Sequence, residues 1–283
     1  MIGKVRTPSY TWEEAIEILR SEPQYDQLIY DAYLTSDLRE NCRRFAESAE
    51  FAETLSLIEK YRSGARDILD MPAGNGIATY ALTRAGFNVV AVEPDSSASV
   101  GRGAIETCLS KAGLNARIVD AFGEELPFEA ESFDVVYVRQ GLHHAQDLNA
   151  MVAQCARVLR PGGLLLACRE HVVDDYGSSL RDFLNAQVDH QLYGGENAFT
   201  LADYRASLVR AGFEVALEMG PYDSPINLHP NTPEILAAKI CGSTPGKILS
   251  CMLPKSIVVK LGIWQLKRSN RPGRLYSFVA IAK

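Results

Sequence analysis

The sequence predicts an α/β protein with a doubly wound, mainly parallel seven-stranded sheet. It also predicts an antiparallel last strand, an N-terminal helical cap and a helical insert between strands six and seven. Three observations lead there: short apolar runs alternate with helix-like stretches from Ile68 onward, no strand pattern precedes them, and about fifty residues separate the last two runs. This alternation is typical of a parallel sheet with helices on both faces. With 283 residues, 47% of them hydrophobic, the chain can bury such a core.

The cap is predicted over residues 1–63, where apolar side chains such as Trp12, Ile16 and Leu19 recur at helical spacing. The sheet domain is predicted over 64–283, with a loop region at 174–200 and the insert at 221–273. Its strands are expected at Asp67–Met71, Asn88–Glu93, Ala116–Val119, Phe133–Val138, Leu164–Arg169, Phe213–Met219 and Leu275–Ala282. A helix over 201–211 should end at Gly212. The insert's spacings favour amphipathic helices that pack over the substrate cleft together with the cap.

Charge is unevenly distributed along the chain, whose formal net charge is −6. Residues 1–234 hold 20 basic and 35 acidic side chains, a net of −15, whereas residues 235–283 hold nine basic side chains and no acid. Such a segment can face an anionic partner, here an anionic small molecule. The plainer alternative is a solvated cationic face.

Cysteine spacing and the N-terminal composition predict a cytoplasmic protein. The six cysteines form no CxxC pair, which favours reduced and mostly buried thiols. Glu13, Glu14 and Glu17 lie where a secretory signal would need an apolar core. No window approaches the roughly 18 apolar residues of a membrane span.

The strongest local feature is the turn after the first predicted strand, which reads DILDMPAGNGI over residues 67–77. Gly74 and Gly76 allow close approach of a ligand to the backbone, and Glu93 ends the next strand, where a carboxylate can accept hydrogen bonds from ribose hydroxyls. A nucleotide-like ligand is indicated. A phosphate-binding Walker loop is disfavoured because no Gly-Lys-Ser/Thr follows, and Thr79 leaves only a partial dinucleotide fingerprint.

Five motifs over about residues 65 to 168 extend this pattern: 70–76, 92–94, 120–128, 132–136 and 158–164. In this order and spacing the chain resembles the class I S-adenosylmethionine-dependent methyltransferase family, of the small-molecule methylase type. Pro72 stands where the family often has glycine. The resemblance implies S-adenosyl-L-methionine as cofactor, bound by Asp70, Pro72, Gly74, Gly76, Glu93, Pro94, Asp120, Ala121, Phe122 and Gln140.

Methyl transfer from a sulfonium is an in-line displacement that needs a base only when the nucleophile must lose a proton. Three histidines follow predicted strands, at the sheet edge where α/β proteins bind ligands. His144 or His171 is the candidate base, His143 is a further candidate, and Glu170 would orient a histidine or contact substrate. The alternative is that His143 and His144 only pack beside the cofactor. No metal site is predicted, because adjacent histidines should point apart and HxxxH spacing is absent.

The candidate substrate-binding residues are Tyr193, Glu196, Asn197, Tyr222 and His229. The resulting prediction is methyl transfer to a small molecule, most simply O-methylation of a saccharide or secondary metabolite. RNA methylation is the alternative, disfavoured because the sheet domain is acidic and no aromatic side chains alternate with basic ones. A further alternative is a cofactor-binding protein without catalysis. Thr79 and Asp120 disfavour a nicotinamide oxidoreductase.

Overall fold

The computed structural model describes residues 10–283, so the first nine residues of the predicted cap lie outside it. Its sheet has the order β3-β2-β1-β4-β5-β8-β7, with β6 paired to β5. Neighbouring strands in the part β3-β2-β1-β4-β5 run parallel, and β8 is antiparallel to both β5 and β7. The strands are β1 (Asp67–Asp70), β2 (Asn88–Val92), β3 (Arg117–Val119), β4 (Phe133–Arg139), β5 (Leu159–Val173), β6 (Phe199–Thr200), β7 (Phe213–Met219) and β8 (Arg274–Ala282). The predicted fold class is confirmed.

Three predictions about the strands and helices were wrong. The sheet has an eighth strand, β6, which is only two residues long and therefore leaves no periodic signal. β5 runs from Leu159 to Val173 and extends beyond the predicted 164–169 at both ends, because Leu159 pairs with Phe133 of β4 and residues 170–172 pair with β8. The predicted loop region 174–200 contains two helices, α8 (Ser178–Ala186) and α9 (Val188–Tyr193).

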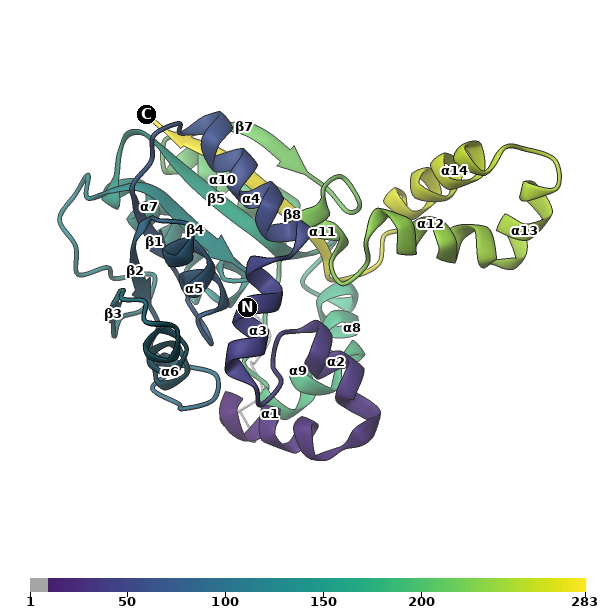
Figure 1. The fold of residues 1–283 in the computed structure, drawn as a ribbon. Helices are drawn as coiled ribbons and strands as arrows, with labels where there is room; N and C mark the ends of the chain where they lie inside the picture. Colours follow the sequence, from purple (N-terminus) through teal and green to yellow (C-terminus); the bar gives the residue numbers. More distant parts are fainter. Residues whose placement is uncertain (1–9) are drawn as a thin grey trace.

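Helices cover both faces of the sheet (Figure 1). Alternate residues of the central strands enter different cores, as the twofold period of a strand requires. Leu69, Val136 and Leu165 pack in one core, whereas Ile68 and Val135 pack in the other. The covering helices are α3 (Leu38–Ala46), α4 (Ala49–Tyr61), α5 (Ile77–Arg84), α6 (Arg102–Ala112), α7 (Leu148–Val158) and α10 (Leu201–Arg210).

The described part of the cap, residues 10–63, is helical and contains no strand. It begins with α1 (Trp12–Ser21), η1 (Pro23–Tyr25) and α2 (Asp26–Asp31), followed by α3 and α4. A capping box between Thr11 and Glu14 starts α1. The cap meets the later helices where Trp12 packs edge-on against Tyr193 at 5.4 Å between ring centroids. The cap therefore lies beside α9 at one side of the site.

The insert is helical as predicted, and both of its ends line the cavity described below, whereas most of its middle part does not. α11 (Pro225–Leu228) lies against α4 and the sheet, while α12 (Pro233–Gly242), α13 (Thr244–Ser250) and α14 (Lys255–Lys267) pack on one another. We call residues 233–267 the arm; it projects from the body (Figure 1), and its last turn contributes Leu266 to the lining of the cavity described below. Large apolar side chains remain exposed on it, among them Met252 at 78% and Trp264 at 54%. No described helix is long and apolar enough to cross a membrane.

Candidate active site

A cavity of about 1520 Å³ opens at the carboxyl ends of β1, β2, β4 and β5, between the cap, α8 and α9. Ligand pockets are usually about 300–1,000 Å³, so the volume suits a cofactor together with a second molecule. One side of the cavity is lined by the glycine turn after β1, and the other by histidines that follow β4 and β5.

The glycine turn is held by Glu93. Its Oε2 accepts a hydrogen bond from the Gly74 N–H at 2.7 Å, and its Oε1 accepts one from the Asp95 N–H at 2.9 Å. Gly74 has φ +53°, and a Cβ added there would meet only open space, so the turn presents bare backbone to the cavity. Pro72 packs against Gly141, where a Cβ would lie 2.3 Å from the proline Cδ. The turns after β1 and β4 are therefore in contact.

Two buried carboxyl groups lie beside this turn. Burial raises the pKa of Asp70 and of Glu93 to about 7. Asp70 accepts a hydrogen bond from the Thr79 hydroxyl at 2.6 Å, which links β1 to the start of α5. Each Glu93 oxygen accepts one backbone N–H and retains capacity for another donor, such as a ribose hydroxyl. The donor and acceptor set fits S-adenosylmethionine.

Two predicted cofactor residues do not line the cavity. Gly76 begins α5, and a Cβ there would lie 3.0 Å from Ile105 of α6, so this glycine allows the two helices to approach. Asp120 has a side chain that is 67% exposed and pairs with Arg102 at 2.9 Å. Arg102, which the sequence analysis missed, also donates to the carbonyls at positions 93 and 94. The remaining predicted cofactor residues line the cavity: Asp70, Pro72, Gly74, Glu93, Pro94, Ala121, Phe122 and Gln140.

The histidines after β4 lie in a short 3-10 helix, η2 (Leu142–His144). The rings of His143 and His144 are 4.3 Å apart between centroids and tilted by 36°. They do not point apart as expected, because the tight turn places both rings toward the cavity. Glu170 on β5 is fully buried and accepts hydrogen bonds from the backbone N–H groups of Gly141 and His143 and from His143 Nδ1 at 2.8 Å. Glu170 thus fixes the orientation of His143.

His171 and His190 extend the cluster. The His171 ring packs against His143 at 4.8 Å and donates from Nδ1 to the Gly273 carbonyl at 2.9 Å. His190, which the sequence analysis missed, is buried 6.3 Å from the His171 ring. Burial lowers the pKa of both His143 and His171 to about 3. Both imidazoles are therefore neutral near pH 7, and each is a weak base.

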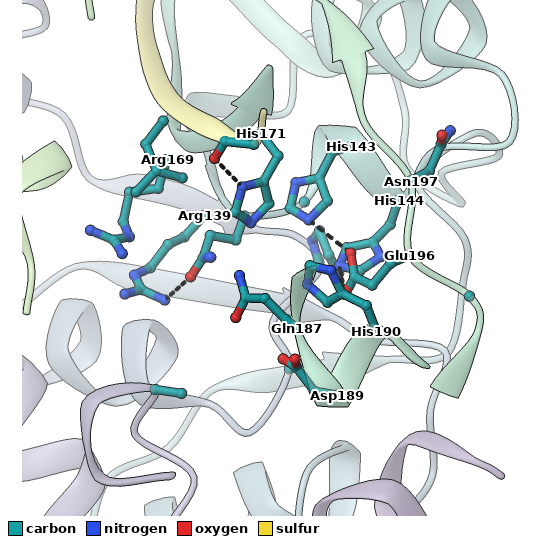
Figure 2. Close-up of a pocket in the computed structure, with 18 of the residues that line it drawn as sticks. Arg139, His143, His144, Arg169, His171, Gln187, Asp189, His190, Glu196 and Asn197 are labelled. Carbon is teal, nitrogen blue, oxygen red and sulfur yellow. Dashed lines mark hydrogen bonds and ion pairs between the residues drawn. The ribbon is translucent and has the colours of Figure 1, made fainter. Parts of the chain in front are cut away.

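The five predicted substrate residues all line the cavity. Glu196 joins the histidines, with its oxygens 3.6 Å from His143 Nε2 and 3.8 Å from His144 Nε2 (Figure 2). His229 instead stacks on Tyr33, accepts from the Tyr33 hydroxyl at 3.3 Å and donates to the Asp31 carbonyl at 2.6 Å. Its two ring nitrogens thus connect α11 to the cap.

A buried ion pair behind the histidines was also missed. Arg139, at the end of β4, bonds Glu50 of α4 through two contacts of 2.6 and 3.1 Å. Glu50 is fully buried, and Arg139 supports the cavity wall next to Gln140. The partners are 89 residues apart, so no local pattern could have indicated the pair.

Comparison with known proteins places the site in a family. Residues 69–167 match the family model described as a methyltransferase domain. A ubiquinone biosynthesis O-methyltransferase from Rhizobium rhizogenes is 30% identical over 134 residues, covering 47% of this chain and 48% of the relative. One from Agrobacterium fabrum is 32% identical over 100 residues, covering 35% and 39%. The chain spans about half the length, or less, of these curated relatives.

Among solved structures, a geranyl diphosphate methyltransferase in complex with GPP and sinefungin aligns with a TM-score of 0.56 at 14% identity, covering 82% of this chain and 78% of that one. At this identity the likeness shows a shared fold. Together with the glycine turn, the acid after β2 and the strand order, the matches show that residues 69–167 form a methyltransferase domain of the class I S-adenosylmethionine-dependent type.

Proposed function

We propose that this protein transfers a methyl group from S-adenosylmethionine to a hydroxyl oxygen of a small molecule. The observation that carries the proposal is the single cavity that joins the glycine turn to the histidine and carboxylate cluster. Glu93 would hold the ribose hydroxyls, and Gly74 would leave space for the amino acid part of the cofactor. The bound cofactor supplies a methyl group on a sulfonium, which is already activated for displacement.

Oxygen is the favoured acceptor atom for two reasons. The curated relatives with about 30% identity are named O-methyltransferases. The lining of the cavity includes Tyr193, Asn197 and Tyr222 as well as the histidines. Hydroxyl and amide groups of this kind suit a polyol such as a saccharide. A small secondary metabolite with hydroxyl groups fits the same set.

A proton must leave a hydroxyl acceptor, and His144 and His171 remain the proposed groups to receive it. His171 donates through Nδ1 and so keeps an unprotonated Nε2. Its pKa of about 3, caused by burial, makes it inefficient as a base near pH 7. His144 is 37% exposed and lies at the cavity surface. His144 is therefore the better placed of the two.

An anionic acceptor would be held by arginines after the arm and not by the arm itself. Arg271 and Arg274 line the cavity, and Arg274 pairs with Asp174. Lys247, Lys255 and Lys260 lie on the projecting helices. We propose that a phosphate or carboxylate on the acceptor meets Arg271. Steep salt dependence of the KM for acceptor, lost in Arg271→Gln, would support this; a salt-independent KM would contradict it.

The test is a methyl-transfer screen with labelled S-adenosylmethionine over sugars, nucleotide sugars, phenols, lipids and RNA. Label in a small-molecule product, lost in Glu93→Ala, supports the proposal. Label in RNA alone would replace it with the RNA alternative. Cofactor binding by calorimetry without any transfer over the panel would favour the binding protein without catalysis.

A further inference from the structure

The cluster of His143, His144 and Glu196 has the composition of a metal site. Two imidazole nitrogens and a carboxylate oxygen all lie within 4.8 Å of one another and face the cavity (Figure 2). We propose that His143 Nε2, His144 Nε2 and the Glu196 carboxylate bind one divalent transition-metal ion of the Zn²⁺ or Mn²⁺ type. The binding site stands independently of the proposed function, whereas its role in methyl transfer rests on that function.

The distances are those of ligands around an ion and not those of hydrogen bonds. The Glu196 oxygens lie 3.6 Å from His143 Nε2 and 3.8 Å from His144 Nε2, beyond hydrogen-bond range. Bonds of about 2.1 Å to a tetrahedral metal place neighbouring ligand atoms about 3.4 Å apart. The three ligand atoms lie within 4.8 Å of one another, so a rotation of the His144 side chain, which is 37% exposed, would be needed to bring all three to this spacing.

An unsatisfied charge points to the same ion. The Glu196 side chain is only 8% exposed, and its Oε2 has no hydrogen-bond partner among residues 10–283. Buried charges are normally paired or coordinate a metal. A cation between Glu196 and the histidines would satisfy the carboxylate.

His143 is already prepared as a ligand. Its Nδ1 lies 2.8 Å from Glu170 Oε2, and that carboxylate also accepts the Gly141 and His143 backbone N–H groups. The ring therefore donates from Nδ1 and presents a lone pair on Nε2. Metal-binding histidines usually have a carboxylate on the second nitrogen, which fixes the ring and raises its ligand strength. Glu170 is a positioning residue in this arrangement.

The ligand set selects the kind of ion. Imidazole nitrogens suit Zn²⁺ and related ions, the carboxylate also suits Mn²⁺, and Mg²⁺ prefers an all-oxygen shell. Three protein ligands are typical of catalytic sites, which leave a position open for water or substrate. Here the open coordination position would face the cavity in which the proposed acceptor binds.

In the proposed reaction the ion would bind the acceptor hydroxyl and lower its pKa. The O–H bond breaks and the proton leaves to water in the cavity. The oxygen electron pair then forms the bond to the methyl carbon while the carbon–sulfur bond of the sulfonium donor breaks, its electron pair going to sulfur. One proton is released for each methyl transferred. With the ion bound, His144 is a metal ligand, so water in place of a histidine receives the proton that the proposed function assigns to a histidine base.

The experiment measures metal binding directly. The full chain, without an added histidine tag, is freed of metal with chelator and titrated with Zn²⁺ and Mn²⁺ by calorimetry, with no methyl donor or acceptor. We expect one equivalent to bind. Glu196→Gln should weaken binding by more than about 100-fold, since outer-shell changes alone cost about 10- to 100-fold. Glu124→Gln is the matched control, because Glu124 lines the cavity rim and accepts the Gln146 N–H.

His144→Asn provides a second variant, in case Glu196→Gln does not fold. His144 is 37% exposed, so its replacement should leave the fold intact while weakening metal binding. Less than a tenth of an equivalent bound to the wild type would overturn the proposal. Wild-type affinity for the metal in every ligand variant that folds would also overturn it. Metal binding without methyl transfer to any acceptor would contradict only the proposed function. Full methyl-transfer activity in the metal-free protein would contradict only the metal's role.

Discussion

The cavity and the arm make opposite use of charged side chains. At the cavity, charged and titratable groups are buried and hydrogen-bonded: Glu93 binds two backbone N–H groups, and Glu170 binds two backbone N–H groups and the ring N–H of His143. On the arm, lysines are solvent-facing, and within the described chain only Lys267 forms an ion pair, with Asp223 of the body. Buried pairs change energies strongly when one partner is lost, whereas exposed charges contribute little. Function should therefore depend on the cavity and hardly on the arm.

The largest expected effect is at Glu93. Glu93→Ala removes the acceptor for two proposed ribose hydroxyls and for the Gly74 and Asp95 N–H groups. Hydrogen bonds to a charged group contribute about 1.5–3 kcal/mol each, so cofactor affinity should fall by at least about 100-fold. Calorimetry with S-adenosylhomocysteine measures this. A loss below about fivefold would show that the ribose lies elsewhere.

Glu170→Gln should have the next largest effect. The amide can accept through only one oxygen, so the contacts to Gly141 and His143 cannot all persist. We expect kcat to fall by about 10- to 100-fold while the KM for cofactor changes little, as for the loss of an outer-shell partner. Steady-state kinetics separate the two constants. A rise in the cofactor KM at constant kcat would instead indicate a purely structural role near the turn.

Cofactor affinity should depend on pH through Glu93. Burial raises its pKa to about 7, so the carboxylate that accepts ribose hydroxyls is present above pH 7 and is lost below it. Affinity should fall by about tenfold between pH 8 and pH 6. Glu93→Gln should flatten the profile, and any remaining slope belongs to Asp70, whose pKa is also raised to about 7. Equal affinity at both pH values in the wild type would contradict this.

The smallest effect is expected on the arm. Replacement of Lys247, Lys255 and Lys260 by glutamine should change kcat/KM for a small acceptor by less than about twofold, because none of the three lines the cavity and the helices that carry them project from the body. Kinetics at low salt provide the measurement. A large rise in acceptor KM would place the arm at the site and undo the contrast between the two regions.

The same two regions show how far sequence reasoning reaches. The turn and Glu93 follow from local order, since a strand, glycines and the next strand end specify their positions. The histidine cluster depends on contacts between distant segments. η2, the end of β5 and the segment after α9 are far apart in the sequence and come together only when the chain folds. His190 was missed because its segment was taken as loop. The arm could not be placed from the sequence, because amphipathic spacing reports that a face is apolar and not what covers it.

The central claim is that the glycine turn and the histidine cluster form one active site. A crystal structure with S-adenosylhomocysteine and Mn²⁺ tests it most directly. We predict ribose hydroxyls on Glu93, the thioether directed toward His143 and His144, and an anomalous peak between these histidines and Glu196. The cofactor product bound with its thioether turned away from the cluster would contradict the account.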